Sequence, residues 1–225
     1  MPVNQDESPS QLAAIYHNRF DLDEDYRNQV WKALVDCWFQ RYIPAQSAVL
    51  DLGCGYGQFI NNIACTKKYA MDLNAVSGTK LNADVTFVEQ DGSTTWNLAG
   101  NSLDVVFTSN FFEHLLSMAD LANTVAQALR CLKPGGRIIA MGPNMRFVGG
   151  AYWDFLDHHL ALTERSVKEC FETAGFHTEY VLDRFLPYTM VNVPRFPAAL
   201  LRLYLRLPFL WKRFGRQFVV IATKP

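Results

Sequence analysis

The sequence predicts an α/β fold in which helices pack on both faces of a parallel sheet. Residues 48–52 (AVLDL) read as a buried strand, and three alternating glycines and a helix-compatible run come directly after it. Residues 103–109 (LDVVFTS) form another largely apolar strand, as expected where both faces of a parallel sheet are covered. Residues 119–132 repeat apolar side chains at the spacing of an amphipathic helix. At 225 residues the chain is long enough for one sizeable domain of this kind.

The glycine turn after the first strand allows a ligand to approach the backbone closely. Gly53, Gly55 and Gly57 carry no Cβ atoms, so backbone N–H groups can reach a bound molecule at the start of a helix. The spacing places Gln58 where a dinucleotide fingerprint has its third glycine, which disfavours a pyrophosphate ligand. Asp51, at the end of the strand, would repel a phosphate and attract an ammonium group.

The composition is that of an ordinary soluble protein, with 49% apolar residues and a net charge of −1. The five cysteines are scattered and form no CxxC pair, so neither a disulfide framework nor a zinc site of cysteines is expected. A reducing cytoplasm fits this usage best. The first ten residues, MPVNQDESPS, are polar and acidic, and we do not expect them to act as a signal peptide.

Five motifs follow one another along the chain. They are DLGCGYG at residues 51–57, KYAMDL at 68–73, the turn at Asp91, SNFFEHL at 109–115 and LKPGGRIIA at 132–140. Together, in this order, they resemble the motifs of class I S-adenosylmethionine (SAM)-dependent methyltransferases. The resemblance implies SAM as the cofactor and S-adenosylhomocysteine as the product.

The resemblance also implies the architecture: a Rossmann-like sheet of seven strands in the order 3-2-1-4-5-7-6, with the last strand antiparallel and helices on both faces. Residues 1–45 are expected to form an N-terminal helical cover, and residues 46–225 the methyltransferase domain. Inserts to the minimal fold are expected at about residues 143–162 and 186–215. Seven segments fit the strands: residues 48–52, 68–73, 85–88, 103–109, 137–142, 176–185 and 217–223.

The resemblance assigns most of the cofactor contacts to the ends of the first three strands. The glycine turn, with Asp51, would wrap the amino-acid end of the cofactor. Asp72 would accept both ribose hydroxyls, because a carboxylate offers two acceptor oxygens, and Leu73 follows it in the same site. Asp91, followed by Gly92, would accept from the adenine amino group, although an Asp-Gly pair is also a turn signal in its own right.

Two further cofactor contacts are expected from more distant segments. Asn110, in SNFFEHL, lies in the segment beneath the transferring methyl group. Tyr16 and Arg19, in the helical cover, could reach the cofactor carboxylate; the alternative is a packed tyrosine and a solvated arginine.

The SNFFEHL segment argues against two classes of substrate. Methyltransferases that act on exocyclic amines of nucleic-acid bases carry an Asn/Asp-Pro-Pro-aromatic segment here, and this chain has no such prolines. It also lacks the paired-glutamate loop of arginine methyltransferases, since Glu113 and His114 stand alone. Nucleic acid is therefore not an expected partner. We interpret Glu113 as orienting the loop and His114 as a packed histidine.

The insert after the fifth strand is the expected place for the chemistry. It begins at the carboxyl edge of the sheet, where ligands of open α/β sheets bind, and it is rich in aromatic and acidic residues. His158 is the predicted general base for a hydroxyl acceptor, with Asp157 or Asp154 orienting it. Two alternatives stay open: a structural histidine that caps the following helix, and a metal site of Asp154, Asp157 and His158.

The C-terminal part of the chain is basic. Residues 184–225 contain eight Lys/Arg and no Asp or Glu. A helix is expected from Pro197 to Leu207, ended by Pro208. Arginines interrupt its apolar run well before a membrane-spanning length, but residues 195–216 could lie in a membrane interface. The alternative is a buried helix pair or a homodimer contact.

The whole chain further resembles methyltransferases of bacterial polysaccharide and glycolipid gene clusters, in the segments YWDFLDHH, LTERS and FLPYT. This resemblance implies O-methylation of a sugar hydroxyl on a glycan or a lipid-linked glycan, in the cytoplasm or at the inner face of the membrane. Two alternatives remain: methylation of a small apolar or quinone-like acceptor, and a SAM-binding partner subunit without catalysis.

Overall fold

The structure is a computed structural model that describes residues 24–188 and 197–225. Most of the expected N-terminal cover, including Tyr16 and Arg19, lies outside these residues. Within the described part of this region the chain forms α2 (Glu24–Cys37), followed by the 3-10 turn η2 (Phe39–Tyr42).

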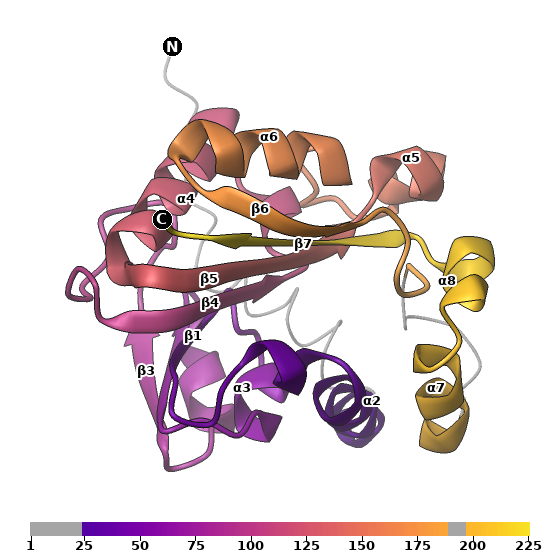
Figure 1. Cartoon of the computed structure of the whole chain (residues 1–225), viewed down its shortest axis with the longest axis horizontal. Coiled ribbons are helices and arrows are strands. Elements are labelled where there is room, and N and C mark those ends of the chain that lie inside the picture. Colours follow the sequence, from indigo (N-terminus) through magenta and orange to yellow (C-terminus); the bar gives the residue numbers. More distant parts are fainter. Residues whose placement is uncertain (1–23, 189–196) are drawn as a thin grey trace.

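Seven strands form one sheet in the order β3-β2-β1-β4-β5-β7-β6, which confirms the predicted topology (Figure 1). Strand β7 runs antiparallel to both of its neighbours, β5 and β6, and the pairs among β1 to β5 are parallel. The bounds are β1 Ala48–Leu52, β2 Lys67–Asp72, β3 Val85–Glu89, β4 Leu103–Ser109, β5 Leu132–Pro143, β6 His177–Leu182 and β7 Gln217–Thr223.

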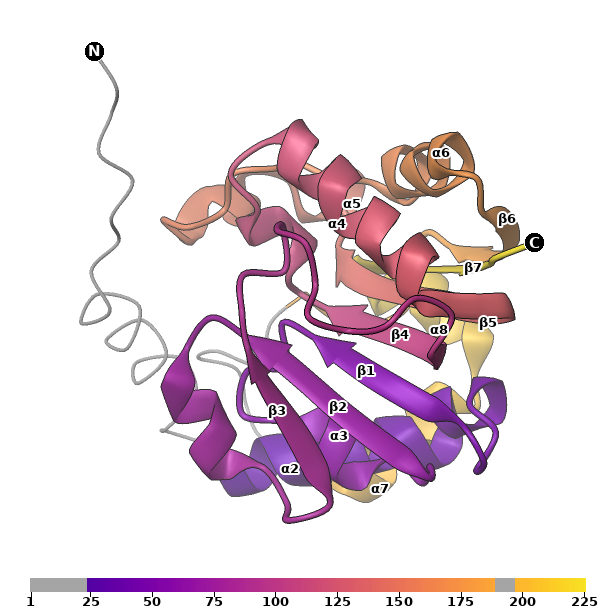
Figure 2. The same ribbon diagram turned by 90° about the vertical axis from the view of Figure 1, so that its left-hand side faces the viewer.

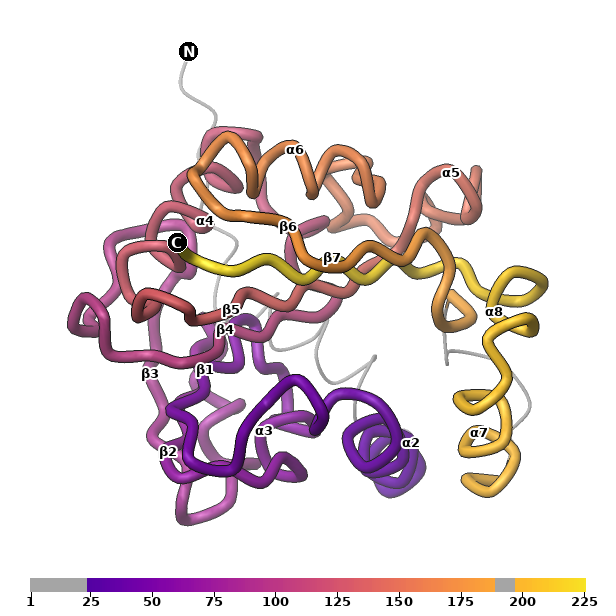
Figure 3. Tube along the Cα trace, in the orientation of Figure 1, coloured from indigo at the N-terminus to yellow at the C-terminus, as the bar shows by residue number. Residues whose placement is uncertain are grey.

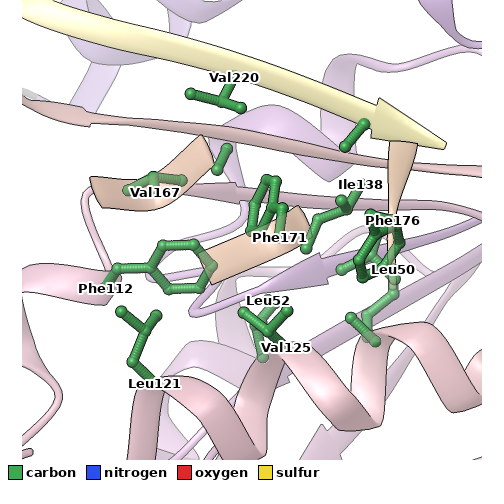
Figure 4. Close-up of a cluster of buried hydrophobic side chains, with 14 of the residues drawn as sticks. Leu50, Leu52, Phe112, Leu121, Val125, Ile138, Val167, Phe171, Phe176 and Val220 are labelled. Carbon is green, nitrogen blue, oxygen red and sulfur yellow. The ribbon is translucent and has the colours of Figure 1, made fainter. Parts of the chain in front are cut away.

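Helices cover both faces of the sheet. Figure 2 shows α4 (Met118–Cys131) and α6 (Glu164–Ala174) on one side, and α2, α3 (Gln58–Asn62) and α7 (Ala198–Leu205) on the other. Because successive side chains of a strand point to opposite faces, each central strand contributes to two cores. Leu50 and Leu52 pack in the core beneath α4 and α6 (Figure 4), whereas Val49 lies in the opposite core. Burial on both faces explains why β1 and β4 read as nearly continuous apolar runs.

Local signals set the ends of the two helices that face the first core. The Ser117 side chain accepts from the Asp120 N–H and caps α4. Thr163 and Ser166 form a capping box at the start of α6, and Gly175 ends it with a φ of 105°. These two signals explain why α6 begins after Thr163 and ends at Ala174.

The C-terminal insert forms two short helices instead of the predicted one. Helix α7 ends at Leu205, and Pro208 is the first residue of α8 (Pro208–Phe214), where its missing N–H costs nothing. Helix α7 packs against α2, and Arg202 pairs with Asp36 at 2.9 Å. Figure 3 shows α7 beside α2, and α8 between α7 and the start of β7. The prediction that Pro208 ends a helix was thus incomplete, because the proline also begins the next one.

Candidate active site

The loops that follow β1, β2, β3, β4 and β5 leave from one edge of the sheet, because these strands are parallel. This edge holds the glycine turn, the loop after Asp72, the Asp91 turn, the 3-10 turn η4 (Phe112–His114) and the insert. The insert contains α5 (Met145–Val148) and the 3-10 helix η5 (Gly149–Asp154). All the predicted site residues within the described parts of the chain therefore belong to the same edge.

The glycine turn adopts a conformation that other residues rarely take. Gly53, Gly55 and Gly57 all have positive φ angles, of 68°, 53° and 73°. The N–H groups of Gly53 and Cys54 both donate to the Met71 carbonyl, at 2.9 and 3.1 Å. These bonds join the turn to the end of β2, so the backbone of the turn has a defined shape before any ligand binds.

Asp51 is buried at the end of β1, with 3% of its surface exposed. Burial raises the pKa of its carboxyl to about 8; a hydrogen bond from the Ile60 N–H opposes the rise, and the charge of Asp72 adds to it. A buried carboxyl with a raised pKa is stabilised in its charged form by a nearby cation. The site is thus suited to the ammonium group predicted from the sequence.

Asp72 is also buried, and two backbone groups fix its side chain. Its Oδ2 accepts from the Gly55 N–H at 2.8 Å, and its Oδ1 accepts from the Asn74 N–H at 2.9 Å. A carboxylate can accept about four hydrogen bonds, more than these two. Leu73, the next residue, is 60% exposed and offers an apolar surface beside the carboxylate. The ribose contact of Asp72 and the cofactor contact of Leu73 stay predictions.

Asp91 forms the turn that its sequence signal also allows. Its exposed carboxylate accepts from the N–H and the hydroxyl of Ser93, both at 2.8 Å. The adenine contact stays a prediction. Asn110, at the end of β4, is exposed and has a positive φ of 51°, and its N–H donates to the Met141 carbonyl. Its contact with the cofactor is likewise a prediction.

Phe111 is a site residue that the sequence did not reveal. A Cβ atom on Gly53 would lie 2.5 Å from the Phe111 ring, and one on Gly92 would lie 3.0 Å from it. The ring is therefore in close contact with two glycines from different loops, which sets the spacing between the β1 turn and the Asp91 turn. The signal in the sequence was the pair of glycines, but it does not indicate which side chain they accommodate.

Glu113 and His114 are the second feature that the sequence interpretation underestimated. Glu113 is buried, and its carbonyl accepts from the N–H groups of His159 and Leu160, at 2.8 and 3.2 Å. His114 Nδ1 lies 3.1 Å from the Asp157 carboxylate. Burial alone would lower the pKa of His114, but the bond to Asp157 and the charge of Glu113 raise it above its ordinary value. These contacts attach the insert to η4.

The predicted base, His158, lies against the same residues. It is buried, and its Nδ1 is 2.8 Å from the Tyr152 carbonyl. Its ring stacks on Phe155 and lies edge-on to His114, with centroids 5.1 and 4.9 Å away. The two predicted orienting acids separate: Asp157 bonds to His114, and Asp154 is exposed. Their catalytic roles stay predictions.

Among the described residues, one group of three side chains lies close enough to hold a metal ion: Glu113, His114 and His158. It differs from the alternative metal site that the sequence suggested, since it shares only His158 with that set. Glu113 and His114 are adjacent in the sequence, whereas His158 comes from an insert far along the chain.

Residues 50–140 match the family described as a methyltransferase domain. A segment of 143 residues is 29% identical to a probable S-adenosylmethionine-dependent methyltransferase of Mycolicibacterium smegmatis. Residues 50–140 are therefore similar to a methyltransferase domain, and a wider segment is similar to a SAM-dependent methyltransferase. The match covers 61% of the chain and 54% of that relative, so the chain spans about half of the relative's length.

Solved structures show the same methyltransferase fold. A SAM-dependent methyltransferase from Archaeoglobus fulgidus matches with a TM-score of 0.61 at 21% identity, over 86% of this chain and 94% of the other. A chain of the Haloferax volcanii complex between the Trm112 methyltransferase activator and a methyltransferase matches with a TM-score of 0.68 at 18% identity, over 96% and 97%. The [4+2]-cyclase SpnF also matches, with a TM-score of 0.61 at 19% identity, over 86% and 80%. The fold therefore does not determine the reaction.

SAM, the cofactor of this methyltransferase domain, fits the residues at the sheet edge. Its ammonium and sulfonium groups are cationic, and Asp51 and Asp72 place two buried carboxyl groups beside the glycine turn. The N–H groups of Gly53, Cys54 and Gly55 bond within the protein, so the fit to SAM depends on the acids, and Asp72 can accept from ribose hydroxyls. When bound, SAM supplies the methyl group, and the chain holds and orients it.

Replacing Asp72 by Asn should weaken SAM binding by about 30-fold or more, since losing a charged hydrogen-bond acceptor costs about 2 kcal/mol. Equilibrium dialysis with labelled SAM measures the affinity, and circular dichroism checks the fold. Asp84→Asn is the matched control, because Asp84 is an exposed acid whose partner is Lys68 at 2.9 Å. Equal affinities of the two variants would contradict the ribose role of Asp72.

Asp51 makes the stability of the methyltransferase domain depend on pH. Its pKa rises from 3.8 to about 8 on folding, so between these pH values the folded protein holds a proton that the unfolded chain releases. The contribution of Asp51 to stability therefore falls as the pH rises through this window. Asp51→Asn cannot ionise, so its free energy of unfolding relative to the natural protein should increase from pH 5 to pH 8. Urea unfolding at both pH values measures this, and a constant difference would refute the assignment.

Proposed function

We propose that this protein transfers the methyl group of SAM to a hydroxyl group of a sugar, on a glycan or a lipid-linked glycan. The observation that carries the proposal is the position of the cluster of Glu113, His114 and His158. Phe111 contacts Gly53 and Gly92 of the cofactor side, and Glu113 follows it by two residues in the chain. This adjacency supports the proposal, because it puts a polar cluster close to the loops that we expect to hold the cofactor.

The chemistry of a hydroxyl acceptor explains why such a cluster is useful. Methyl transfer is an in-line displacement from a sulfonium, and much of the catalysis comes from positioning the two reactants. A hydroxyl must also lose its proton, and a histidine that titrates near neutral pH suits this task. An apolar ring without an ionisable group would have no need of two imidazoles and two carboxylates. His158 remains the base predicted from the sequence.

Replacing His158 by Ala should reduce turnover by about 100-fold or more without changing the affinity for SAM. His159→Ala is the matched control, because the neighbouring His159 side chain is exposed. Single-turnover transfer of labelled methyl to the acceptor measures the effect. Equal rates for the two variants would remove His158 from the reaction.

The lipid-linked form of the acceptor is supported by the surface of α7 and α8. Four large apolar side chains are exposed there, with three basic neighbours and no acidic residue from 197 to 225; they are Leu200, Leu203, Phe209 and Phe214, with Arg206, Lys212 and Arg213. None of the helices that the structure describes is long and apolar enough to cross a membrane. Apolar side chains among cations are suited instead to the interface of an anionic membrane.

Binding to lipid vesicles tests whether the surface of α7 and α8 contacts an anionic membrane. The protein should sediment with vesicles of phosphatidylglycerol at low salt, and much less with vesicles of phosphatidylcholine. Lys212→Gln with Arg213→Gln should weaken the binding about 30-fold, since each cation near an anionic surface contributes about 1 kcal/mol. Arg165→Gln, on the exposed side of α6, should have no effect. Binding that ignores lipid charge would exclude the electrostatic contact.

The acceptor itself is identified with labelled SAM and fractionated bacterial extract, with Asp72→Asn as the negative control. Label in the organic phase that mild acid converts to a water-soluble sugar supports a lipid-linked glycan. Label that stays in the organic phase points to a quinone-like acceptor. If the protein binds SAM but no fraction becomes labelled, the result would contradict catalytic methyl transfer and favour a non-catalytic partner subunit.

A further inference from the structure

One group of ligand atoms joins η4 to the insert. The carboxylate of Glu113 and one ring nitrogen each from His114 and His158 all lie within 4.8 Å of one another. Glu113 and His158 are buried, and the side chain of His114 is 27% exposed, which leaves a path from solvent. The backbone reinforces the arrangement, since the Glu113 carbonyl binds the N–H groups of both His159 and Leu160.

In each of the two imidazoles, Nδ1 faces oxygen atoms. His114 Nδ1 faces the Asp157 carboxylate at 3.1 Å and the Asp157 carbonyl at 3.0 Å. His158 Nδ1 faces the Tyr152 carbonyl at 2.8 Å. An oxygen acceptor at Nδ1 selects the tautomer that has its lone pair on Nε2. This is the arrangement that metal-binding histidines nearly always show, with the second ring nitrogen donating to a carboxylate or a backbone carbonyl.

We propose that Glu113, His114 and His158 form a binding site for a divalent transition metal ion, with Asp157 and the Tyr152 carbonyl orienting the two imidazoles. Two neutral imidazoles with the carboxylates of Glu113 and Asp157 carry a charge of −2, which a divalent cation neutralises. Nitrogen ligands favour Zn²⁺, Co²⁺ or Fe²⁺ over Mg²⁺ and Ca²⁺, which prefer oxygen ligands.

The three ligand atoms lie farther apart than they would around a bound metal ion. Zn²⁺ binds nitrogen and oxygen ligands at about 2.0 to 2.2 Å, so ligand atoms around it lie about 3.4 Å apart. The three atoms would draw together by about 1.4 Å at most, which side-chain rotation supplies. Three protein ligands leave one position of a tetrahedral ion open. This is the number of ligands found in sites that act on a substrate, whereas structural sites usually have four.

The inference changes the role of His158. As a ligand it would hold the ion, and a coordinated acceptor hydroxyl would lose its proton more easily because the cation lowers its pKa. Only this consequence depends on the proposed function. Metal binding itself is measured without any acceptor. The protein could therefore methylate an acceptor without binding a metal ion, or bind a metal ion without methylating the acceptor.

The test uses the full chain, purified without a polyhistidine tag and stripped with EDTA. Titration with Co²⁺ should show one equivalent bound, with visible absorption bands of a four- or five-coordinate ion, and Zn²⁺ should displace it. His114→Ala, His158→Ala and Glu113→Gln should each weaken binding by at least about 10-fold, and Asp157→Asn by about 10- to 100-fold. Circular dichroism confirms that each variant is folded.

Two control variants change residues that are not ligands of the proposed metal site. His159→Ala changes an exposed group of the same insert and Asp84→Asn changes an exposed acid elsewhere, and both should leave the affinity unchanged. If a variant fails to fold, X-ray absorption of the Zn²⁺ complex of the natural protein replaces it and should show two imidazoles and oxygen ligands. No bound Co²⁺ or Zn²⁺ at micromolar concentration, or binding that is equal in the controls and in the His114→Ala and His158→Ala variants, would overturn the proposal.

Discussion

The contact of Phe111 with Gly53 and Gly92 connects the two halves of the site. On one side of the ring lie the glycine turn and the Asp91 turn, and on the other side the chain continues directly into η4. A side chain larger than hydrogen at Gly53 would meet the ring at 2.5 Å and would also strain a backbone with positive φ. The Phe111 ring therefore constrains the approach of the two turns, and Gly53 has the stricter requirement because its φ is also positive.

Buried acids are the second constraint on this edge of the sheet. Asp51, Asp72 and Glu113 are all nearly inaccessible to solvent, although burying a charged carboxylate is costly unless a partner compensates it. The compensation differs between the two halves. Backbone N–H groups hold Asp72, and the cationic end of SAM would complement Asp51. His114 and His158 lie close to Glu113, and the proposed metal ion would balance the charge of its carboxylate. Buried carboxylates of this kind, with their unfavourable desolvation, are typical of ligand-binding sites.

Much of the fold could be predicted from the sequence. Strands buried on both faces appear in it as apolar runs, and the turn after β1 appears as three glycines at alternate positions. Strand β7 was predicted to the residue. The glycine turn and Asp72 were found for the same local reasons. Contacts between loops could not be predicted. The approach of Glu113 to His158 depends on how an insert folds back over η4, and neither residue carries a local signal of the other.

A crystal structure of the protein with S-adenosylhomocysteine tests the central claim, that cofactor and acceptor chemistry meet at this edge. The account predicts the ribose hydroxyls on the Asp72 carboxylate, the amino-acid end along the glycine turn near Asp51, and the sulfur facing the cluster of Glu113, His114 and His158. A product whose sulfur points away from this cluster would contradict the account, because the cluster would then be too remote to act on the acceptor.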